Sequence, residues 1–181
     1  MNYSEIKFCD IANGEGVRTS LFVSGCRRHC KNCFNHEAWS FTAGKPFDEA
    51  AKKSILDSLD APYVAGLTLL GGEPMEPENQ AGLVDFLEEV KRTYPHKTIW
   101  LFTGGVIESF FPGGCEHTEY TDRILSTLDI MVDGPFVQDL YDITLRFRGS
   151  SNQRIIDVPK TLKCRKVILW KDDPILSSHG M

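Results

Sequence analysis

The sequence predicts an α/β fold in which most strands are parallel, formed by a single domain that spans residues 1–181. Short apolar runs alternate along the chain with stretches of helical periodicity, as is typical of βαβ units. With 181 residues, 41% of them hydrophobic, the chain is long enough for one sizeable core and short for two. It contains no fixed-period repeat, low-complexity block or linker.

The first half of the chain predicts two strands separated by a helix. Residues 19–24 (TSLFVS) are apolar and β-branched and end at Gly25, which predicts a buried strand that leads directly into a cysteine-rich loop. Residues 66–70 (GLTLL) predict a second strand, followed by a glycine-rich turn at 71–74. Between them, residues 46–59 predict a helix, because apolar residues recur every fourth position on one face: Phe47, Ala51, Ile55 and Leu59.

The second half continues the alternation. Apolar residues at helical spacing predict a helix around Leu83, Phe86, Leu87 and Val90. A strand is expected at 98–103 and a helix near 119–128. Further strands are expected at 129–132, 154–158 and 166–170, and the polar residues 172–181 are expected to be loosely held.

Charge and hydropathy narrow the choice of partners. A net charge of -5 and an isoelectric point near 5.5 give no general attraction to phosphate backbones, so no nucleic-acid partner is expected. No apolar run is long enough to cross a bilayer, and the first residues, MNYSEIKFCD, lack the order of a signal peptide. We therefore expect a cytoplasmic protein without a membrane partner.

The cysteines are unevenly distributed, and in the reducing cytosol they are not expected to form disulfides. Cys26, Cys30 and Cys33 fall within one short loop and offer three soft thiolate ligands. With His36 they have the spacing of a Cys3His zinc site. Without it they fit a 4Fe-4S cluster in which one iron stays open to an external ligand, as a catalyst requires.

The three other cysteines are isolated in the sequence. Cys9 and Cys164 are expected to be buried as small apolar residues. Cys115 lies in the turn-rich stretch FFPGGCEH and is expected to be exposed. We predict no metal ligand among them.

The cysteine loop and the turn at 71–74 are expected to form one site. Each follows a predicted strand, and the carboxyl ends of parallel strands meet at the same edge of a sheet, where α/β proteins bind their ligands. The sequence therefore predicts that both segments face the same cavity.

Four segments together resemble a known superfamily. The stretch GEGVRTSLFVSGCRRHCKNCFNHEAW is similar to the cluster-binding segment of the radical S-adenosylmethionine (radical SAM) superfamily. Within it, the chain is most similar to the family that activates anaerobic ribonucleoside-triphosphate reductase. The resemblance covers about residues 11–156 and includes Gly71-Gly72-Glu73-Pro74, Asp133-Gly134-Pro135-Phe136 and the stretch FRGSSNQR at 147–154.

The chain departs from the superfamily pattern at the third cysteine. Most members carry an aromatic residue immediately before it, where this chain has Asn32. Phe34 and Asn35 follow Cys33 instead, which resembles the glycyl-radical activases. By this resemblance Phe34 is a candidate contact for the cofactor.

The resemblance implies a fold, a cofactor set and a site. A chain this short cannot form a full barrel of about 250 residues, so a partial, open (β/α) barrel of the radical SAM type is expected. The three cysteines would hold a 4Fe-4S cluster whose fourth iron binds S-adenosyl-L-methionine. The residues implied as further cofactor contacts are Gly71, Gly72, Glu73 and Pro74 at the methionyl end, together with Asp133, Asn152 and Phe34.

The resemblance also implies an activity and partners. The enzyme would reductively cleave S-adenosylmethionine to a 5'-deoxyadenosyl radical and so generate a glycyl radical on anaerobic ribonucleoside-triphosphate reductase. An electron donor such as flavodoxin would supply the electron, attracted by the positive charges of Arg27, Arg28, His29 and Lys31. A solvated loop surface is the simpler interpretation of those charges.

Two other functions remain open at this point. A radical SAM enzyme could act on a small molecule in a closed pocket, without a protein partner. A zinc-stabilised binding module would use the cysteines and His36 for structure alone.

Overall fold

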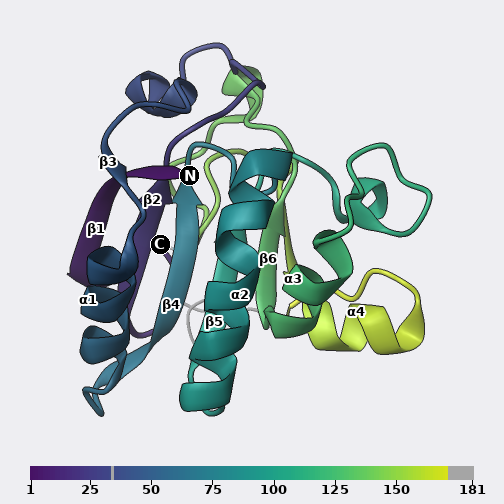
Figure 1. Cartoon of the computed structure of the whole chain (residues 1–181). Coiled ribbons are helices and arrows are strands. Elements are labelled where there is room, and N and C mark those ends of the chain that lie inside the picture. Colours follow the sequence, from purple (N-terminus) through teal and green to yellow (C-terminus); the bar gives the residue numbers. More distant parts are fainter. Residues whose placement is uncertain (34, 171–181) are drawn as a thin grey trace.

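A computed structural model describes residues 1–33 and 35–170, and within them all the strands belong to one mixed seven-stranded sheet (Figure 1). Phe34 and the predicted loose end at 172–181 lie outside the described residues. The strand order is β3-β1-β2-β4-β5-β6-β7. The strands are β1 (Asn2–Asp10), β2 (Val17–Val23), β3 (Lys45–Pro46), β4 (Val64–Gly71), β5 (Thr98–Phe102), β6 (Ile130–Asp133) and β7 (Arg154–Asp157).

The sheet is parallel in its centre and antiparallel at its edges. The neighbouring strands β2, β4, β5 and β6 are parallel, whereas β1, β3 and β7 pair antiparallel. The sheet is not closed, because β3 and β7 form its two edges within the described residues. The predicted α/β class is therefore confirmed, and the predicted preference for parallel strands holds for the four central strands.

Helices connect the strands. The α-helices are α1 (Glu49–Leu59), α2 (Pro77–Thr93), α3 (Thr121–Thr127) and α4 (Val158–Cys164). Three short 3-10 helices lie in the loops: η1 (His36–Trp39), η2 (Ile107–Phe110) and η3 (Gln138–Leu140). No helix in the described part of the chain is both long and apolar enough to cross a membrane.

Helix α1 begins three residues later than the sequence predicted. Pro46 belongs to the short strand β3, and Asp48 is the N-cap, where its carboxylate accepts a hydrogen bond from the Ala51 amide at 3.0 Å. Ile55 and Leu59 are fully buried, as the four-residue spacing indicated. The cap sets the boundary, because it satisfies an amide that the first helical turn cannot satisfy itself.

The main core lies between the sheet and the helices α1, α2 and α3, which cover one of its faces (Figure 1). The predicted apolar stripe of α2 is buried against this face. Leu67 and Leu69 of β4 point into the same core, at alternate positions along the strand. The long α2 thus fixes the centre of the sheet, and the carboxyl ends of β4 and β5 with it.

The other face of the sheet carries a smaller cluster built on Trp100 and a buried cation. Arg18 of β2 has no exposed surface and lies over the Trp100 ring, with its guanidinium carbon 5.4 Å from the ring centre. It donates hydrogen bonds to Thr68 Oγ1 at 2.7 Å and to the carbonyls of Leu67 and Thr98, both at 2.8 Å. Burial lowers the pKa of Arg18 to about 10, so it remains charged at neutral pH. The arginine therefore joins three adjacent strands by neutral acceptors.

Several further elements differ from the sequence prediction. Residues 166–170 were predicted as a strand, but they make only the isolated bridge between Leu169 and Ile156. Helix α4 was not predicted; Asp157 caps it by accepting a hydrogen bond from the Lys160 amide at 3.0 Å. Strand β1 was not predicted either, because most of its side chains are exposed or only half-buried and the strand lacks an apolar run.

Replacement of the buried arginine tests this account of the second face. Arg18→Met should lower the free energy of unfolding by about 2–4 kcal/mol, because it leaves buried carbonyls of β4 and β5 without donors. Denaturant unfolding at pH 7 would measure the loss. Arg123→Met is the control, since that exposed arginine bonds to Asp85 and Glu88 at the surface and its loss should change the free energy of unfolding much less. Equal losses in the two variants would contradict the assigned role of Arg18.

Candidate functional site

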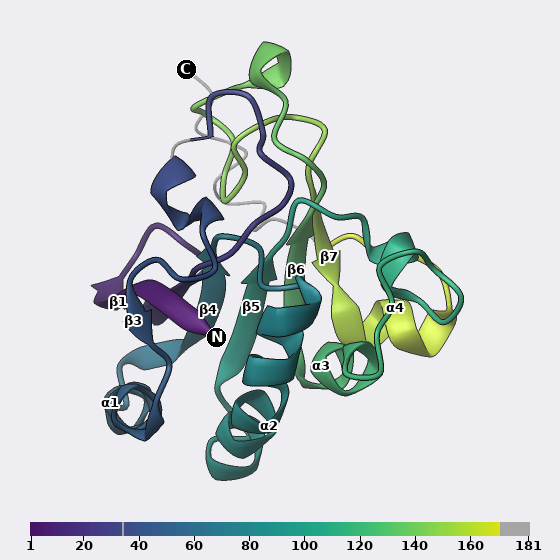
Figure 2. The same cartoon turned by 45° about the horizontal axis from the view of Figure 1, so that its top comes forward.

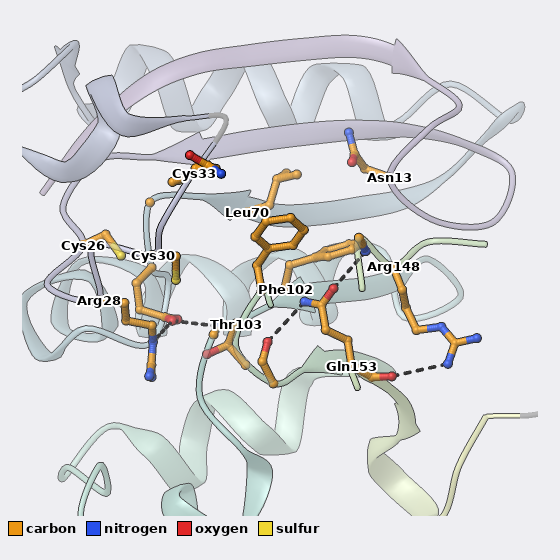
Figure 3. A pocket seen from close by; sticks show the side chains of 18 of the residues that line it. Asn13, Cys26, Arg28, Cys30, Cys33, Leu70, Phe102, Thr103, Arg148 and Gln153 are labelled. Atoms are coloured by element: carbon orange, nitrogen blue, oxygen red, sulfur yellow. Dashed lines mark hydrogen bonds and ion pairs between the residues drawn. The ribbon is translucent and has the colours of Figure 1, made fainter. Parts of the chain in front are cut away.

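A cavity of about 470 Å³ opens at the carboxyl ends of the central strands (Figure 3). Cys26, Cys30 and Cys33 line it, together with Gly71, Gly72 and Glu73. The prediction that the cysteine loop and the glycine-rich turn face one cavity is confirmed. The lining also includes apolar side chains from four segments: Trp39, Leu70, Phe102, Phe136 and Phe147.

Backbone hydrogen bonds join the two loops directly. The Gly72 amide donates to the Val23 carbonyl at 2.7 Å, and the Glu73 amide donates to the Gly25 carbonyl at 2.9 Å. Gly25 has φ of +99°, a conformation that glycine adopts without strain, and its own amide donates to the Ala38 carbonyl at 2.7 Å. The chain therefore enters the cysteine loop along the turn at 71–74.

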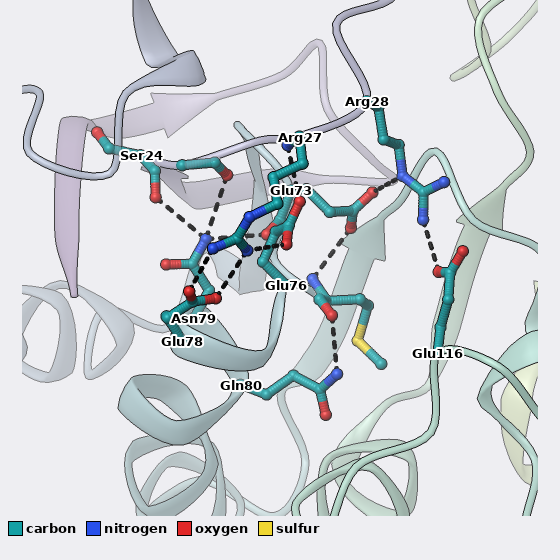
Figure 4. Close-up of polar contacts among 11 residues, drawn as sticks. Ser24, Arg27, Arg28, Glu73, Glu76, Glu78, Asn79, Gln80 and Glu116 are labelled. Carbon is teal, nitrogen blue, oxygen red and sulfur yellow. Dashed lines mark hydrogen bonds and ion pairs between the residues drawn. The ribbon is translucent and has the colours of Figure 1, made fainter.

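Arg28 ties the cysteine loop to two other segments (Figure 4). Its Nε donates to Glu73 at 2.6 Å and its Nη2 donates to Glu116, also at 2.6 Å. Glu73 is 3% exposed and also accepts hydrogen bonds from the amides of Gly104 and Met75. Burial lowers the pKa of Arg28, but the two carboxylates outweigh it, so the pKa lies above its ordinary value. Glu116 thereby gives the turn-rich stretch FFPGGCEH at 110–117 a structural role.

The start of α2 holds the same loop from the other side (Figure 4). Glu76 accepts a hydrogen bond from the Arg27 amide at 2.7 Å and another from its guanidinium at 2.6 Å. Glu78 bonds to the same guanidinium, which lowers the pKa of Glu78 to about 2. Asn79 is fully buried, and its side-chain amide donates to the carbonyls of Ser24 and Glu73.

These pairs change the interpretation of the basic residues in the cysteine loop. The charges of Arg27 and Arg28 are balanced by four glutamates, so neither arginine offers a free positive charge to a docking protein. Among the basic residues of this loop, only Lys31 and His29 make no ion pair within the described residues. The side chains of Arg27 and Arg28 instead fix the loop that carries the cysteines.

The three thiols suit an iron-sulfur cluster better than one zinc ion. All three are half-buried, and burial raises the pKa of Cys26, with Glu73 and Glu76 adding to the effect. Sulfurs bound to one tetrahedral zinc ion lie about 3.8 Å apart, because each Zn–S bond is about 2.3 Å. Within residues 1–33 and 35–170, no three His, Cys, Asp or Glu side chains gather closely enough to bind one ion. In a cluster each cysteine binds a different iron, so wider spacing fits.

His36, the fourth ligand of the zinc alternative, contacts a residue that lines the cavity. Its ring packs edge-on against Trp39, with the ring centres 6.3 Å apart. His29 stacks on the same Trp39 ring, with ring centres 4.4 Å apart. Both histidines therefore help to position η1 beside the cysteine loop.

The other predicted cofactor contacts are spread over the site. Pro74 is buried behind the turn and does not line the cavity. Asp133 and Asn152 line a neighbouring depression: Asp133 is fully buried and pairs with Arg154 at 2.6 Å, and Asn152 donates to the Pro135 carbonyl at 2.8 Å. Phe34 lies outside the described residues. The cofactor contacts of these four residues stay predictions.

Three polar residues in the cavity were not singled out from the sequence. Arg148 and Asn13 lie at the end of the cavity away from Cys26 and Cys30 (Figure 3). Arg148 donates to the Gln153 carbonyl at 3.3 Å, and its buried Nε has no hydrogen-bond partner among the described residues. Gln153 accepts hydrogen bonds from the amides of Gly149 and Ser150. The motif at 147–154 pointed to this segment, but only the fold shows which of its side chains face inward.

The isolated cysteines lie outside the site. Cys115 is exposed, as predicted. Cys9 and Cys164 were predicted to be buried, but both are exposed. Cys9 lies on the solvent-facing strand β1 and Cys164 at the end of the short helix α4, where the core does not reach. The sequence around them has too few apolar residues to cover them.

Comparison with known proteins gives consistent matches over most of the chain. Residues 12–156 match a family described as a 4Fe-4S single cluster domain. The chain is 42% identical to the anaerobic ribonucleoside-triphosphate reductase-activating protein of Pasteurella multocida over 157 residues, which cover 86% of this chain and 96% of that protein. It is 36% identical over 155 residues to the protein of that name from Escherichia coli K12, covering 84% and 96%. The one from Enterobacteria phage T4 is 36% identical, covering 86% and 93%.

A single methyl group tests the close approach of the two loops. In Gly72→Ala the added Cβ would lie 2.6 Å from the Gly25 carbonyl oxygen, so the turn and the cysteine loop must separate. We expect about a tenfold or larger loss of cluster affinity, measured as iron and sulfide retained after anaerobic reconstitution.

The control for that substitution is Gly113→Ala. Gly113 has φ of +87° and open space around its Cβ position, so alanine there should cost about 1–2 kcal/mol of stability and leave the iron content unchanged. Full iron retention in Gly72→Ala would show that the spacing between the loops does not control cluster binding.

Proposed function

The chain belongs to the 4Fe-4S single cluster domain family and to the anaerobic ribonucleoside-triphosphate reductase-activating proteins, and we propose that it activates the reductase through a cluster held by Cys26, Cys30 and Cys33. It is an enzyme that generates a glycyl radical on the reductase. One observation carries the assignment of the site: three thiols from one short loop share a cavity with the Gly-Gly-Glu turn. We further propose that residues 1–181 act as one radical SAM domain, a partial barrel, in the cytoplasm.

The proposed cofactors are a 4Fe-4S cluster and S-adenosylmethionine. When bound, they supply the chemistry: one electron cleaves the sulfonium to methionine and a 5'-deoxyadenosyl radical, which removes a hydrogen atom from a glycine of the reductase. Cys26, Cys30 and Cys33 would hold the cluster and would leave one of its irons open to S-adenosylmethionine. An electron donor such as flavodoxin is proposed as the source of the electron.

The protein's own residues position these groups and exclude water. Gly71 and Gly72 have no side chain, and a Cβ at either position would meet the backbone of Phe22 or Gly25, so these glycines let the turn pack against β2 and the cysteine loop. Because the Glu73 carboxylate is already shared by Arg28 and two backbone amides, we propose that Glu73 acts by holding the turn and the cysteine loop together. Leu70 and Phe102 form an apolar wall of the cavity, which protects a reactive radical from solvent.

The two alternatives have less support. A zinc-stabilised module would need the cysteines and His36 around one ion, whereas no three such side chains gather closely enough for that within the described residues. An enzyme for a small molecule would not explain identity to reductase-activating proteins along most of the chain.

Substitution of one cysteine tests the proposed site. The glycyl-radical signal that Cys30→Ser produces on the reductase should be at least about tenfold weaker than that produced by the parent protein, because the remaining thiolates bind the cluster weakly. The measurement is electron paramagnetic resonance of the reductase after anaerobic incubation with the reconstituted variant, S-adenosylmethionine and dithionite. Metal analysis of the same sample should find iron lost.

Two control variants make this test specific. Cys164→Ser removes an exposed cysteine outside the cavity and should keep both iron and activity. His36→Ala should also keep both if the histidine is no ligand. Zinc bound by the parent protein and lost in His36→Ala would refute the cluster and restore the structural alternative.

A further inference from the structure

One loop that contributes Gln138 and Tyr141 to the cavity lining also carries a group of exposed apolar side chains. Leu140, Tyr141 and Ile143, which we call the mouth rim, are 43%, 53% and 83% exposed. Single exposed apolar residues are normal on a protein surface, but these three fall within four positions of one loop. Together they form a local apolar surface at loop positions where polar residues are usual.

The mouth rim is held rigidly by its own loop. The Leu140 carbonyl accepts a hydrogen bond from the Ser151 amide at 2.9 Å, and the Tyr141 amide donates to Gln138 at 3.1 Å. Asp142 accepts from the amide and the hydroxyl of Thr144, at 2.8 and 2.7 Å, in a local turn. This turn keeps Ile143 in solvent, so the surface is already ordered before any partner binds.

The mouth rim is continuous with the cavity. Tyr141 and Gln138 line the cavity themselves, and the Tyr141 ring packs on Phe136, another lining residue, with ring centres 6.2 Å apart. Asn32 of the cysteine loop lies within 3.5 Å of the Gln138 side chain. Figures 1 and 2 both show η3, the short green helix, beside the loop that carries the cysteines.

A further exposed apolar residue, on another segment, lies next to residues that line the cavity. Ile11 is 75% exposed and directly precedes Ala12 and Asn13, both of which line the cavity. The 11–16 segment approaches the loop that follows the mouth rim, because Glu15 and Arg146 lie 3.9 Å apart. Apolar surface therefore flanks the cavity on two segments distant in sequence.

We infer that the mouth rim is the docking surface for the glycine-bearing segment of the reductase. In the complex, an apolar side chain that neighbours the glycine in that segment packs on Leu140 and Ile143. The inference rests on the proposed function. The hydrogen atom is removed inside the cavity, so the glycine must enter it and the residues beside the glycine must pass the mouth. Apolar side chains there would be buried only when the segment is bound, which favours binding without closing the free site.

Ile143→Asp tests the inference, with Tyr63→Asp as the matched control. Tyr63 is 64% exposed and lies just before the start of β4, at the opposite end of that strand from the cavity. Each cluster-loaded variant is titrated with reductase, using dithionite as reductant, and the glycyl signal is read by electron paramagnetic resonance. Two further measurements are cleavage of S-adenosylmethionine without reductase and binding of the reductase by sedimentation.

Ile143→Asp should raise the reductase concentration for half-maximal activation about tenfold or more and weaken binding in sedimentation equally. Cleavage without reductase should stay within about twofold of the parent value. Tyr63→Asp should match the parent protein in all three measurements. Ile11→Asp, on the second segment, should resemble Ile143→Asp.

Three results would overturn the inference. The first is that Ile143→Asp reaches half-maximal activation at the same reductase concentration as the parent protein. The second is binding of the reductase by Ile143→Asp in sedimentation that equals the parent protein's binding. The third is a large fall in melting temperature of the isolated variant, which would show that the rim packs against its own chain. Failure of the parent protein to form any glycyl radical would instead refute the proposed function itself.

Discussion

The parallel pairing of β2 with β4 is the constraint on which the site depends. Because the two strands run in the same direction, the loops that follow them leave the sheet at one edge. The amides of Gly72 and Glu73 then bond to the carbonyls of Val23 and Gly25, so the turn and the cysteine loop share backbone hydrogen bonds. A shift of either strand by one residue would reverse its side chains and break this junction. The position of the cysteines is therefore determined by the core, far from the cavity.

Ion pairs also hold the cysteine loop in place, in addition to the backbone hydrogen bonds. The cysteine loop has little apolar surface of its own, and ion pairs to three separate segments take the place of a core there. Arg28 reaches Glu73 and Glu116, while Arg27 reaches the first turn of α2. The pair of Arg28 with Glu73 is well shielded from solvent, so loss of either partner would leave a charge buried without compensation. These ion pairs thus fix the loop that carries the cysteines to three other segments of the chain.

The sequence predicted those parts of the fold whose signals are local. Apolar spacing indicated helix α1 and the stripe of α2, and the cysteine spacing with the 71–74 turn indicated the shared cavity. Strand β1 was missed because its partners, not its composition, make it a strand. Residues 166–170 have strand-like composition but find no extended partner. Which side chain of 147–154 faces the cavity depends on how that loop folds back on 134–136, and no local pattern contains this information.

The open sheet explains why the site needs a partner. Helices cover one face of the sheet, and the Arg18–Trp100 cluster fills part of the other, so the chain has few residues left to close the cavity. The radical proposed to form there must be protected from solvent, yet the proposed target glycine must enter from outside. Both demands are met if the incoming segment itself closes the opening. The exposed Ile143 and Leu140 are then one half of an interface that the partner completes. In this way a small chain can carry out chemistry that would otherwise need a full barrel to enclose it.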